Sequence, residues 1–413
     1  MLNRRFLLLG AAVLPTVVRA QVATGRRPPP AHPPAHGAGK PGGKKPGETL
    51  PAGSPAQTPI GPVDTAAKFA VAIDFTTGAV LLDKDADVQM APSSMTKLMT
   101  AYIVYGMLKS GRLKLDQTLP VSERAWRMGG SKMFVQIGTE VKVEDLIRGM
   151  IVQSGNDACI VLAEGISGSE EQFVDLMNAK AKELGLDKSS FRNSTGWPDS
   201  NHRMSAHDIA ELARRIISDF PEYYKYDAEK SFKYNNIDQQ NRNTLVQKGV
   251  ADGLKTGHTE EGGYGMVVTA ERGGRRTIVV VNGLTTMHAR AEEAERLLDW
   301  TFREFENVPL FTAGATVDRA AVWLGATPTV PLVGGRDVVV TMPRGWRTKA
   351  KITVEYSGPI QAPVVRGTVL GQLTVSGDGV PDLSIPLLAG ADVARLGLPG
   401  RAMAVLAHMV TGS

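Results

Sequence analysis

The sequence has little of several features that would place it in a special class of protein. A single cysteine, Cys159, in 413 residues excludes an internal disulfide bond and fits a buried apolar position. Charged residues make up only 22% of the chain and hydrophobic residues 42%, a composition that excludes collagen and wholesale disorder. The apolar run from Phe6 to Val18 is too short for an ordinary membrane-spanning helix.

The part of the chain that is expected to fold has no net positive charge. The net charge is +5, of which residues 1–20 contribute +3 and residues 21–62 contribute +4, so that −2 remains for the rest. A nucleic-acid-binding domain needs a basic face to neutralise phosphates. We therefore predict no nucleic-acid partner.

Metal-binding motifs are also missing from the sequence. None of the histidines outside the proline-rich segment lies in an H-E-x-x-H or H-x-x-H pattern. His202 and His207 share a segment, but their five-residue spacing puts them on different faces of a helix. We predict no metal site and interpret these histidines as surface or core residues. The histidines concerned are His202, His207, His258, His288 and His408.

The N-terminal segment predicts export. Residues 1–20 carry two arginines, an apolar run and the small-residue cleavage site Val18-Arg19-Ala20, the three parts of a signal peptide. Arg4-Arg5 also resembles the twin-arginine pattern, so both export routes stay open. Residues 21–62 are rich in proline and glycine, with almost no apolar periodicity, and are predicted to be a disordered linker.

The remaining chain predicts two domains. Residues 63–307 combine two short apolar strands, helical segments, a strand hairpin and a long amphipathic helix, which indicates an α/β (α+β) domain with flanking helices. Residues 308–388 have short alternating stretches set off by glycine and proline, which indicates a small all-β domain. The helical segments are expected at 94–109, 143–165, 170–184, 205–218 and 288–306.

The apolar tail, residues 389–413, is expected to form a short helix at Arg401–Val410. Packing on the protein, fraying and contact with a membrane surface all stay open for this helix.

Ser94-Met95-Thr96-Lys97 is the only S-x-x-K sequence in the chain, and it opens a predicted helix. One helical turn lets the lysine reach back over the serine. A desolvated, neutral lysine can act as the base that activates a serine hydroxyl. The alternative is that Ser94 only caps the helix.

Two further motifs follow in the chain. Ser154-Gly155-Asn156 lies between two apolar helical runs, where it either points polar groups into a cleft or caps helices. Lys255-Thr256-Gly257-His258 enters the strand hairpin. There the lysine can attract a substrate carboxylate, and the glycine leaves room for substrate backbone. Lys109-Ser110-Gly111 is interpreted as a helix end.

The order S-x-x-K, S-x-N, K-T-G resembles the serine acyl-transfer site of penicillin-binding proteins and class A β-lactamases. The wider sequence resembles the low-molecular-mass D-alanyl-D-alanine carboxypeptidases. Residues 308–388 resemble their β-rich C-terminal domain, and the tail occupies the place of their amphipathic membrane anchor. The segments that carry the resemblance include Gly130–Phe134, Ile151–Ala158, Phe220–Tyr226 and Asp252–Thr259.

The resemblance implies a β-lactamase/transpeptidase-like fold with a mainly antiparallel sheet, and a serine peptidase that needs no cofactor. In that mechanism Ser94 attacks the penultimate D-alanine, Lys97 takes the proton, and Ser154 and Asn156 assist. Lys255, Thr256 and Gly257 would bind the substrate, and the backbone N–H groups of Ser94 and His258 would form the oxyanion hole.

The resemblance also implies partners and a location. The expected substrate is a peptidoglycan stem peptide ending in D-Ala-D-Ala, with β-lactams as covalent inhibitors, and the expected location is the periplasm. Two positions depart from the family pattern, since Ser194 and Trp197 stand where proline and leucine are commoner.

Three alternatives remain open at this stage. A class A-like β-lactamase is disfavoured, because no E-x-x-L-N segment lies between Asn156 and Lys255. The motifs do not separate carboxypeptidase from DD-endopeptidase action on peptide cross-links. A non-catalytic cell-wall-binding module is disfavoured by the intact Ser94, Lys97, Asn156 and Lys255.

Overall fold

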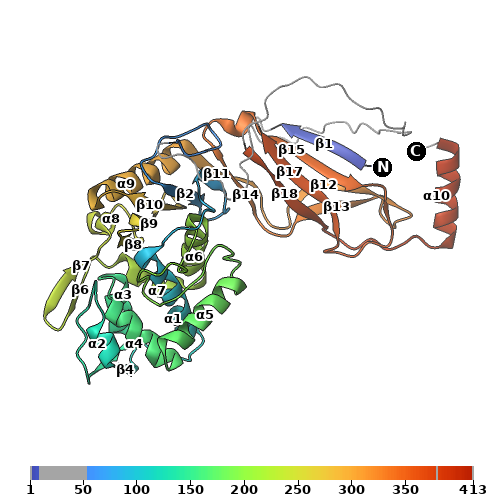
Figure 1. Ribbon diagram of the computed structural model, residues 1–413. Coiled ribbons are helices and arrows are strands. Elements are labelled where there is room, and N and C mark those ends of the chain that lie inside the picture. The colour runs from blue at the N-terminus through green and yellow to red at the C-terminus, as the bar shows by residue number, and fades with distance from the viewer. Residues whose placement is uncertain (1, 9–53, 378–379, 412–413) are drawn as a thin grey trace. The chain divides into compact units, whose positions relative to one another are not determined.

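A computed structural model describes residues 2–8, 54–377 and 380–411 of the chain (Figure 1). It divides into two units: one comprises Gly43–Glu304, the other Phe305–Ser413 with Met1–Gly42. Each unit has its own cluster of buried apolar side chains. Residues 9–20 of the predicted signal peptide and 21–53 of the predicted linker lie outside the described residues.

The larger unit is built on a five-stranded antiparallel sheet with the order β3-β2-β10-β9-β8. β10 carries the continuous buried run Ile278–Val281, as expected for a strand that is covered on both faces. Figure 1 shows this sheet between helix α9 and the helices that include α6. The strands are β2 (Phe69–Asp74), β3 (Val80–Lys84), β8 (Gly253–Thr259), β9 (Gly263–Arg272) and β10 (Arg275–Leu284).

Helices cover the sheet and form most of the core of this unit. α9 packs against β9 and β10, and α6 packs against β2 and β10. α1 is buried almost all round and contacts α3, α4, α5 and α6, which makes it the central helix. The helices are α1 (Lys97–Lys109), α2 (Glu123–Arg127), α3 (Val143–Ile151), α4 (Asn156–Ser167), α5 (Glu170–Glu183), α6 (Ala206–Asp219), α7 (Pro221–Tyr224), α8 (Thr244–Lys248) and α9 (Met287–Glu304).

Short elements complete this unit. Two small hairpins pair β4 with β5 and β6 with β7. Turns of 3-10 helix lead into α1 and follow α7. The elements are η1 (Ser93–Thr96), η2 (Lys225–Ala228), β4 (Thr118–Pro120), β5 (Glu140–Lys142), β6 (Ser231–Tyr234) and β7 (Ile237–Gln240).

Local sequence sets several helix boundaries. The side chains of Ser122, Ser169 and Ser205 accept hydrogen bonds from the backbone N–H three residues on, so α2, α5 and α6 begin there. The helical segment expected at 143–165 is two helices, because the chain breaks at Ser154-Gly155. The sheet and its helices confirm the predicted α/β (α+β) class.

The fold of the larger unit includes residues ahead of the predicted domain start at residue 63. Ala56 pairs with Val63, and Gln57 pairs with Asp83 of β3. Ala56 is fully buried. Because these backbone pairs hold residues 56–63 against the sheet, residues 54–62 belong to the folded unit and not to the linker.

The smaller unit is β-rich, as the sequence predicts. Its seven-stranded sheet has the order β1-β15-β17-β18-β13-β12-β16, and β11 pairs with β14. The strands are β1 (Leu2–Leu8), β11 (Phe305–Phe311), β12 (Thr316–Trp323), β13 (Thr329–Gly334), β14 (Val338–Pro343), β15 (Lys351–Ser357), β16 (Ile360–Gln361), β17 (Val369–Gly377) and β18 (Val380–Ala389). A 3-10 turn, η3 (Trp346–Thr348), and helix α10 (Leu398–Thr411) complete it.

Two details of the smaller unit bear on the expected boundaries. The unit begins at Phe305, where α9 passes into β11, rather than at residue 308. β1 pairs antiparallel with β15 and falls within the predicted signal peptide, so cleavage there stays a prediction. Within residues 2–8, 54–377 and 380–411, no helix has the length and apolar character needed to cross a membrane.

Candidate active site

The start of α1 brings the serine and the lysine of the S-x-x-K motif together. The 3-10 turn η1 runs directly into α1, and side chains three residues apart lie on one face of a helix. Oγ of Ser94 is 2.9 Å from Nζ of Lys97. Ser94 is half-buried and lines a pocket of about 690 Å³, whereas Lys97 is fully buried behind it.

Two obligate acceptors fix the amine of Lys97. Its Nζ donates to Oδ1 of Asn156 and to the backbone carbonyl of Thr195, each at 2.7 Å. With two N–H bonds directed at these acceptors, the remaining position on Nζ faces the hydroxyl of Ser94. Burial lowers the pKa of Lys97 to about 8, against a smaller opposing effect of Cys159 and Asp157. A neutral amine is therefore populated near neutral pH, with its lone pair free for the serine proton.

The S-x-N motif forms the turn between α3 and α4. Ser154 has a φ of 60°, a left-handed conformation that is strained for serine and that clusters at functional sites. Ser154 lines the same pocket as Ser94. The N-cap residue of α4 is Gly155, and no side chain caps this helix.

Asn156 is the first residue of α4, and both ends of its amide are fixed. Nδ2 donates to the carbonyl of Gly129 at 2.8 Å, while Oδ1 accepts from Lys97. The next residue, Asp157, accepts hydrogen bonds from the backbone N–H groups of Met133, Phe134 and Val135. The N-terminus of α4 thus holds both the pocket wall and the amide that orients Lys97.

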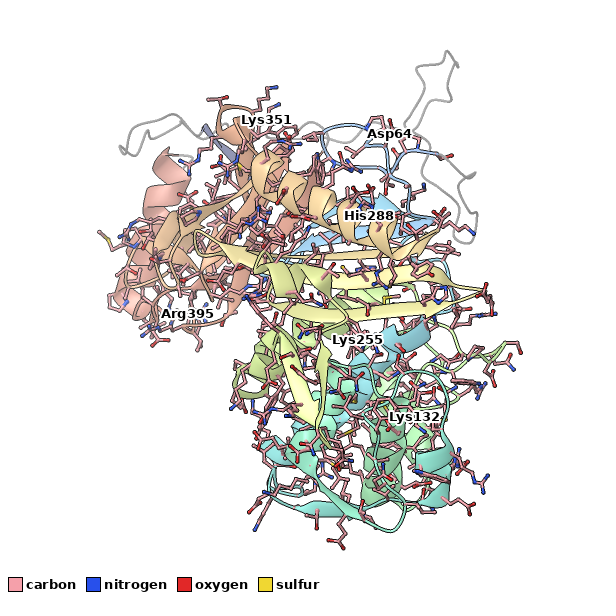
Figure 2. The ribbon with its side chains drawn as sticks, turned by 90° about the vertical axis from the view of Figure 1, so that its left-hand side faces the viewer. Asp64, Lys132, Lys255, His288, Lys351 and Arg395 are labelled. Atoms are coloured by element: carbon pink, nitrogen blue, oxygen red, sulfur yellow. The ribbon has the colours of Figure 1, made fainter. Side chains whose placement is uncertain are left out.

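Lys255 lies on β8 but does not reach the pocket surface. Its side chain is fully buried, and Nζ makes a long 3.3 Å hydrogen bond to the carbonyl of Thr256. Burial, and then the positive charge of Lys97, lower its pKa well below the ordinary lysine value. Figure 2 shows Lys255 where the sheet meets the helical side of this unit, which carries Lys132.

Gly257 has a packing reason to be glycine that the sequence did not show. A Cβ atom there would lie 3.0 Å from Cβ of Ser93 and 3.3 Å from the backbone nitrogen of Ser94. The missing side chain thus allows β8 to approach the start of α1, and room for substrate backbone stays a prediction. Thr256, Gly257 and His258 all line the pocket.

The histidines of this unit have separate structural roles. The exposed ring of His258 stacks on Tyr264 with centroids 3.9 Å apart. His202 is buried: Nδ1 accepts from the N–H of Arg192, and Nε2 donates to Thr96. Burial lowers the pKa of His202 to about 4, so the ring is neutral. No cluster of three or more potential metal ligands occurs among the described residues.

Sequence reasoning missed Arg290 on α9. This buried guanidinium lines the pocket and donates weakly to the carbonyl of Gly257 at 3.4 Å. Its Nε has no hydrogen-bond partner within the described chain. Burial lowers its pKa to about 10, so it stays charged at neutral pH. No motif marks Arg290, because it is one of several arginines on an amphipathic helix.

This chain is similar in sequence to known families and to known proteins. The D-alanyl-D-alanine carboxypeptidase family matches residues 55–286, and the C-terminal domain of penicillin-binding protein 5 matches residues 305–395. The D-alanyl-D-alanine carboxypeptidase DacA of Haemophilus influenzae is 37% identical over 349 residues, which cover 83% of this chain and 89% of that protein.

Solved structures show the same likeness. Penicillin-binding protein 5 of Haemophilus influenzae has a TM-score of 0.75 and 37% identity, covering 80% of this chain and 98% of its own. Ampicillin-bound penicillin-binding protein D2 of Listeria monocytogenes has a TM-score of 0.52 and 29% identity, covering 56% of this chain and 96% of its own.

The chain belongs to the D-alanyl-D-alanine carboxypeptidase family. It is a serine-type D-Ala-D-Ala carboxypeptidase that resembles penicillin-binding protein 5 and carries the same kind of C-terminal domain. The predicted family, fold and activity are thereby confirmed.

Proposed function

We propose that this carboxypeptidase removes the terminal D-alanine from peptidoglycan pentapeptide stems through an acyl-enzyme on Ser94. The observation that carries the proposal is the 2.9 Å separation between the Ser94 hydroxyl and the Lys97 amine, at the wall of a pocket. The amine has its other directions committed to Asn156 and Thr195. A preoriented base beside a hydroxyl is the signature of an activated nucleophile.

Acylation follows from this geometry. Oγ of Ser94 bonds to the carbonyl carbon of the penultimate D-alanine, and its proton passes to the lone pair of Lys97. The bond to the terminal D-alanine then breaks, and the leaving amine takes that proton directly or through the Ser154 hydroxyl. Water later attacks the ester with the same base, which frees Ser94.

The oxyanion that forms during acylation needs hydrogen-bond donors. The close approach of Gly257 to the nitrogen of Ser94 supports a pair of donors from Ser94 and the neighbouring His258 backbone.

Arg290 is the best candidate for the group that holds the terminal carboxylate. It is charged, it lines the pocket and its Nε is unpaired within the described chain. A guanidinium fork suits a carboxylate, and the Thr256 hydroxyl can add a donor. Lys255, buried behind Thr256, supports this end of the pocket from within rather than by direct contact.

We also propose that β-lactams acylate Ser94. The relative from Listeria monocytogenes was solved in an ampicillin-bound form, which supports the same chemistry here. No E-x-x-L-N segment lies between the second and third motifs, which favours a long-lived adduct over rapid turnover of penicillin.

We propose that the protein is exported to the periplasm and that its tail contacts the outer face of the cytoplasmic membrane. The predicted signal peptide supports export. α10 exposes Leu398, Met403, Leu406 and Met409, which supports contact with an apolar surface. Membrane fractionation with and without residues 390–413 tests this proposal, since loss of membrane association should follow only from the deletion.

Purified protein incubated with a muropeptide that ends in D-Ala-D-Ala tests the activity. We expect the product to lose the mass of one alanine, and we expect Ser94→Ala to abolish this loss. Ser110→Ala, in the exposed Lys109-Ser110-Gly111 turn, is the matched control and should leave the rate unchanged. Cleavage of cross-linked dimers at a comparable rate would assign DD-endopeptidase action, and binding without any mass loss would assign a non-catalytic module.

A further inference from the structure

Trp197 presents an exposed aromatic ring in the catalytic pocket. It lines the same pocket as Ser94, and it is 46% exposed. Among exposed tryptophans, Trp126 is comparable at 39% but does not line the pocket. A large apolar side chain left open beside a nucleophile indicates a surface that a ligand covers.

The ring of Trp197 packs against two glycines. A Cβ atom on Gly129 would lie 3.3 Å from Cη2 of Trp197, and one on Gly130 would lie 3.2 Å from Cζ3. The same atom on Gly130 would lie 2.8 Å from Nδ2 of Asn156. Gly130 therefore lies between the indole and the amide that orients Lys97, and a side chain at this position would crowd both.

The backbone that carries the ring is held rigidly. Oδ1 of Asn193 accepts from the N–H groups of Gly196 and Trp197 at 2.7 and 2.9 Å. Gly196 has a φ of +82°, and a Cβ atom there would collide with the carbonyl of Ser93. Because the neighbouring Thr195 carbonyl also binds Lys97, the backbone of Trp197 is held at a set position relative to this amine. A side chain on a fixed backbone has less entropy to lose when a ligand packs on it.

The substrate itself limits what can cover this ring. Both alanine side chains of D-Ala-D-Ala are single methyl groups, too small to cover an indole. The terminal carboxylate is assigned to Arg290, so the peptide on the acyl side of Ser94 has to occupy the rest of the pocket. The first side chain large enough to cover the ring is that of the residue that precedes D-Ala-D-Ala.

We propose that Trp197 is a specificity-determining residue, whose ring packs against the aliphatic part of the side chain that precedes D-Ala-D-Ala in the stem peptide. This proposal rests on the proposed function of Ser94 and deepens it. Aromatic contact of this kind favours a long, unbranched side chain over a short one. It also gives a physical role to a position where the family more commonly has leucine.

Two acetylated tripeptides test the proposal: one carries norleucine and the other alanine before D-Ala-D-Ala. The wild-type enzyme should have the higher kcat/KM on the norleucine peptide. Trp197→Ala should lower the norleucine-to-alanine ratio of kcat/KM by roughly 3- to 10-fold, in line with the energy of an aromatic contact. Trp197→Phe should keep most of the ratio, and Trp126→Ala, the matched control, should leave it unchanged.

The outcomes distinguish a failure of the specificity role of Trp197 from a failure of the proposed function. Equal losses on both peptides in Trp197→Ala would mean that the ring only supports Gly130 and Asn156, which overturns the specificity role. A wild-type enzyme without preference for norleucine also overturns it, while leaving the proposed function intact. Failure of the wild type to release D-alanine from either peptide would instead overturn the proposed function.

Discussion

Glu170 accepts two hydrogen bonds from Ser194, one from its backbone N–H at 2.8 Å and one from its hydroxyl at 2.7 Å. The carbonyl of Ser194 in turn accepts from the hydroxyl of Thr100 on α1. The next carbonyl along, that of Thr195, holds the Lys97 amine. A carboxylate at the start of α5 therefore fixes the segment that orients the amine of Lys97.

Glu170→Ala should weaken both catalysis and stability. The change leaves two buried donors of Ser194 without their acceptor, which costs about 1–3 kcal/mol per unsatisfied group. We expect a smaller free energy of unfolding, measured in urea, and a fall of about tenfold in the rate of labelling by a fluorescent penicillin, because displacement of the Thr195 carbonyl misorients Lys97.

Glu171→Ala is the matched control for this change. Glu171 is exposed and pairs with Arg124 at the surface, where an ion pair contributes about 0–1 kcal/mol. Normal labelling by Glu170→Ala would contradict the positioning role of Glu170.

The approach of β8 to α1 predicts the effect of Gly257→Ala. The added Cβ would lie 3.0 Å from Cβ of Ser93 and 3.1 Å from the carbonyl of Pro92, so β8 must move away from the start of α1. Acylation should slow by roughly tenfold or more, because the proposed oxyanion donors on the two elements separate. Gly397→Ala, where the added atom would meet only Pro399 at 4.0 Å, should acylate like the wild type.

The state of Lys97 predicts how acylation depends on pH. Burial lowers its pKa to about 8, and only the neutral amine can take the serine proton. The neutral fraction rises about tenfold per pH unit below the pKa. The penicillin acylation rate should therefore increase from pH 6 to about 8 and level off above it. A rate that is flat or falling over this range would argue against Lys97 as the base.

The sequence allowed much of the site to be predicted. Ser94 and Lys97 were recognisable because one helical turn fixes their separation. The three motifs could be ordered into one site by their resemblance to a family. Helix α1 was also predictable, because apolar residues recur along its sequence. The hairpin of β9 and β10 was predictable from its two apolar strands and the glycine turn between them.

Other parts of the site depend on tertiary contacts that no local pattern encodes. Thr195 binds Lys97 through its backbone carbonyl, a group that every residue type has, so the sequence does not mark this position. Arg290 reaches the pocket only because α9 packs across β9 and β10. Gly257 also has to leave space for Ser93, which lies 164 residues earlier in the chain. Such roles depend on which distant segments pack together, which the sequence alone does not show.

The neutral state of His202 predicts an acid-sensitive stability. Its pKa is about 4 in the folded protein, against an ordinary value of 6.5, so between these values the unfolded chain binds a proton that the folded chain does not. Stability contributed by this group is thus present above pH 6.5 and is lost as the pH falls toward 4. The loss amounts to roughly 2 kcal/mol at pH 4.5.

His202→Asn isolates this contribution. Urea unfolding at pH 7 and pH 4.5 should show a larger drop in the free energy of unfolding for the wild type than for the variant. An equal decrease in the free energy of unfolding in the two proteins would mean that folding does not lower the pKa of His202.

The central claim, that Ser94 becomes acylated with Lys97 as its base, is tested most directly by mass spectrometry of protein treated with penicillin. We predict one covalent adduct per chain, located on the peptide that contains Ser94, and a greatly slowed adduct in Lys97→Ala. An adduct on another residue, or normal acylation without the lysine amine, would contradict the account.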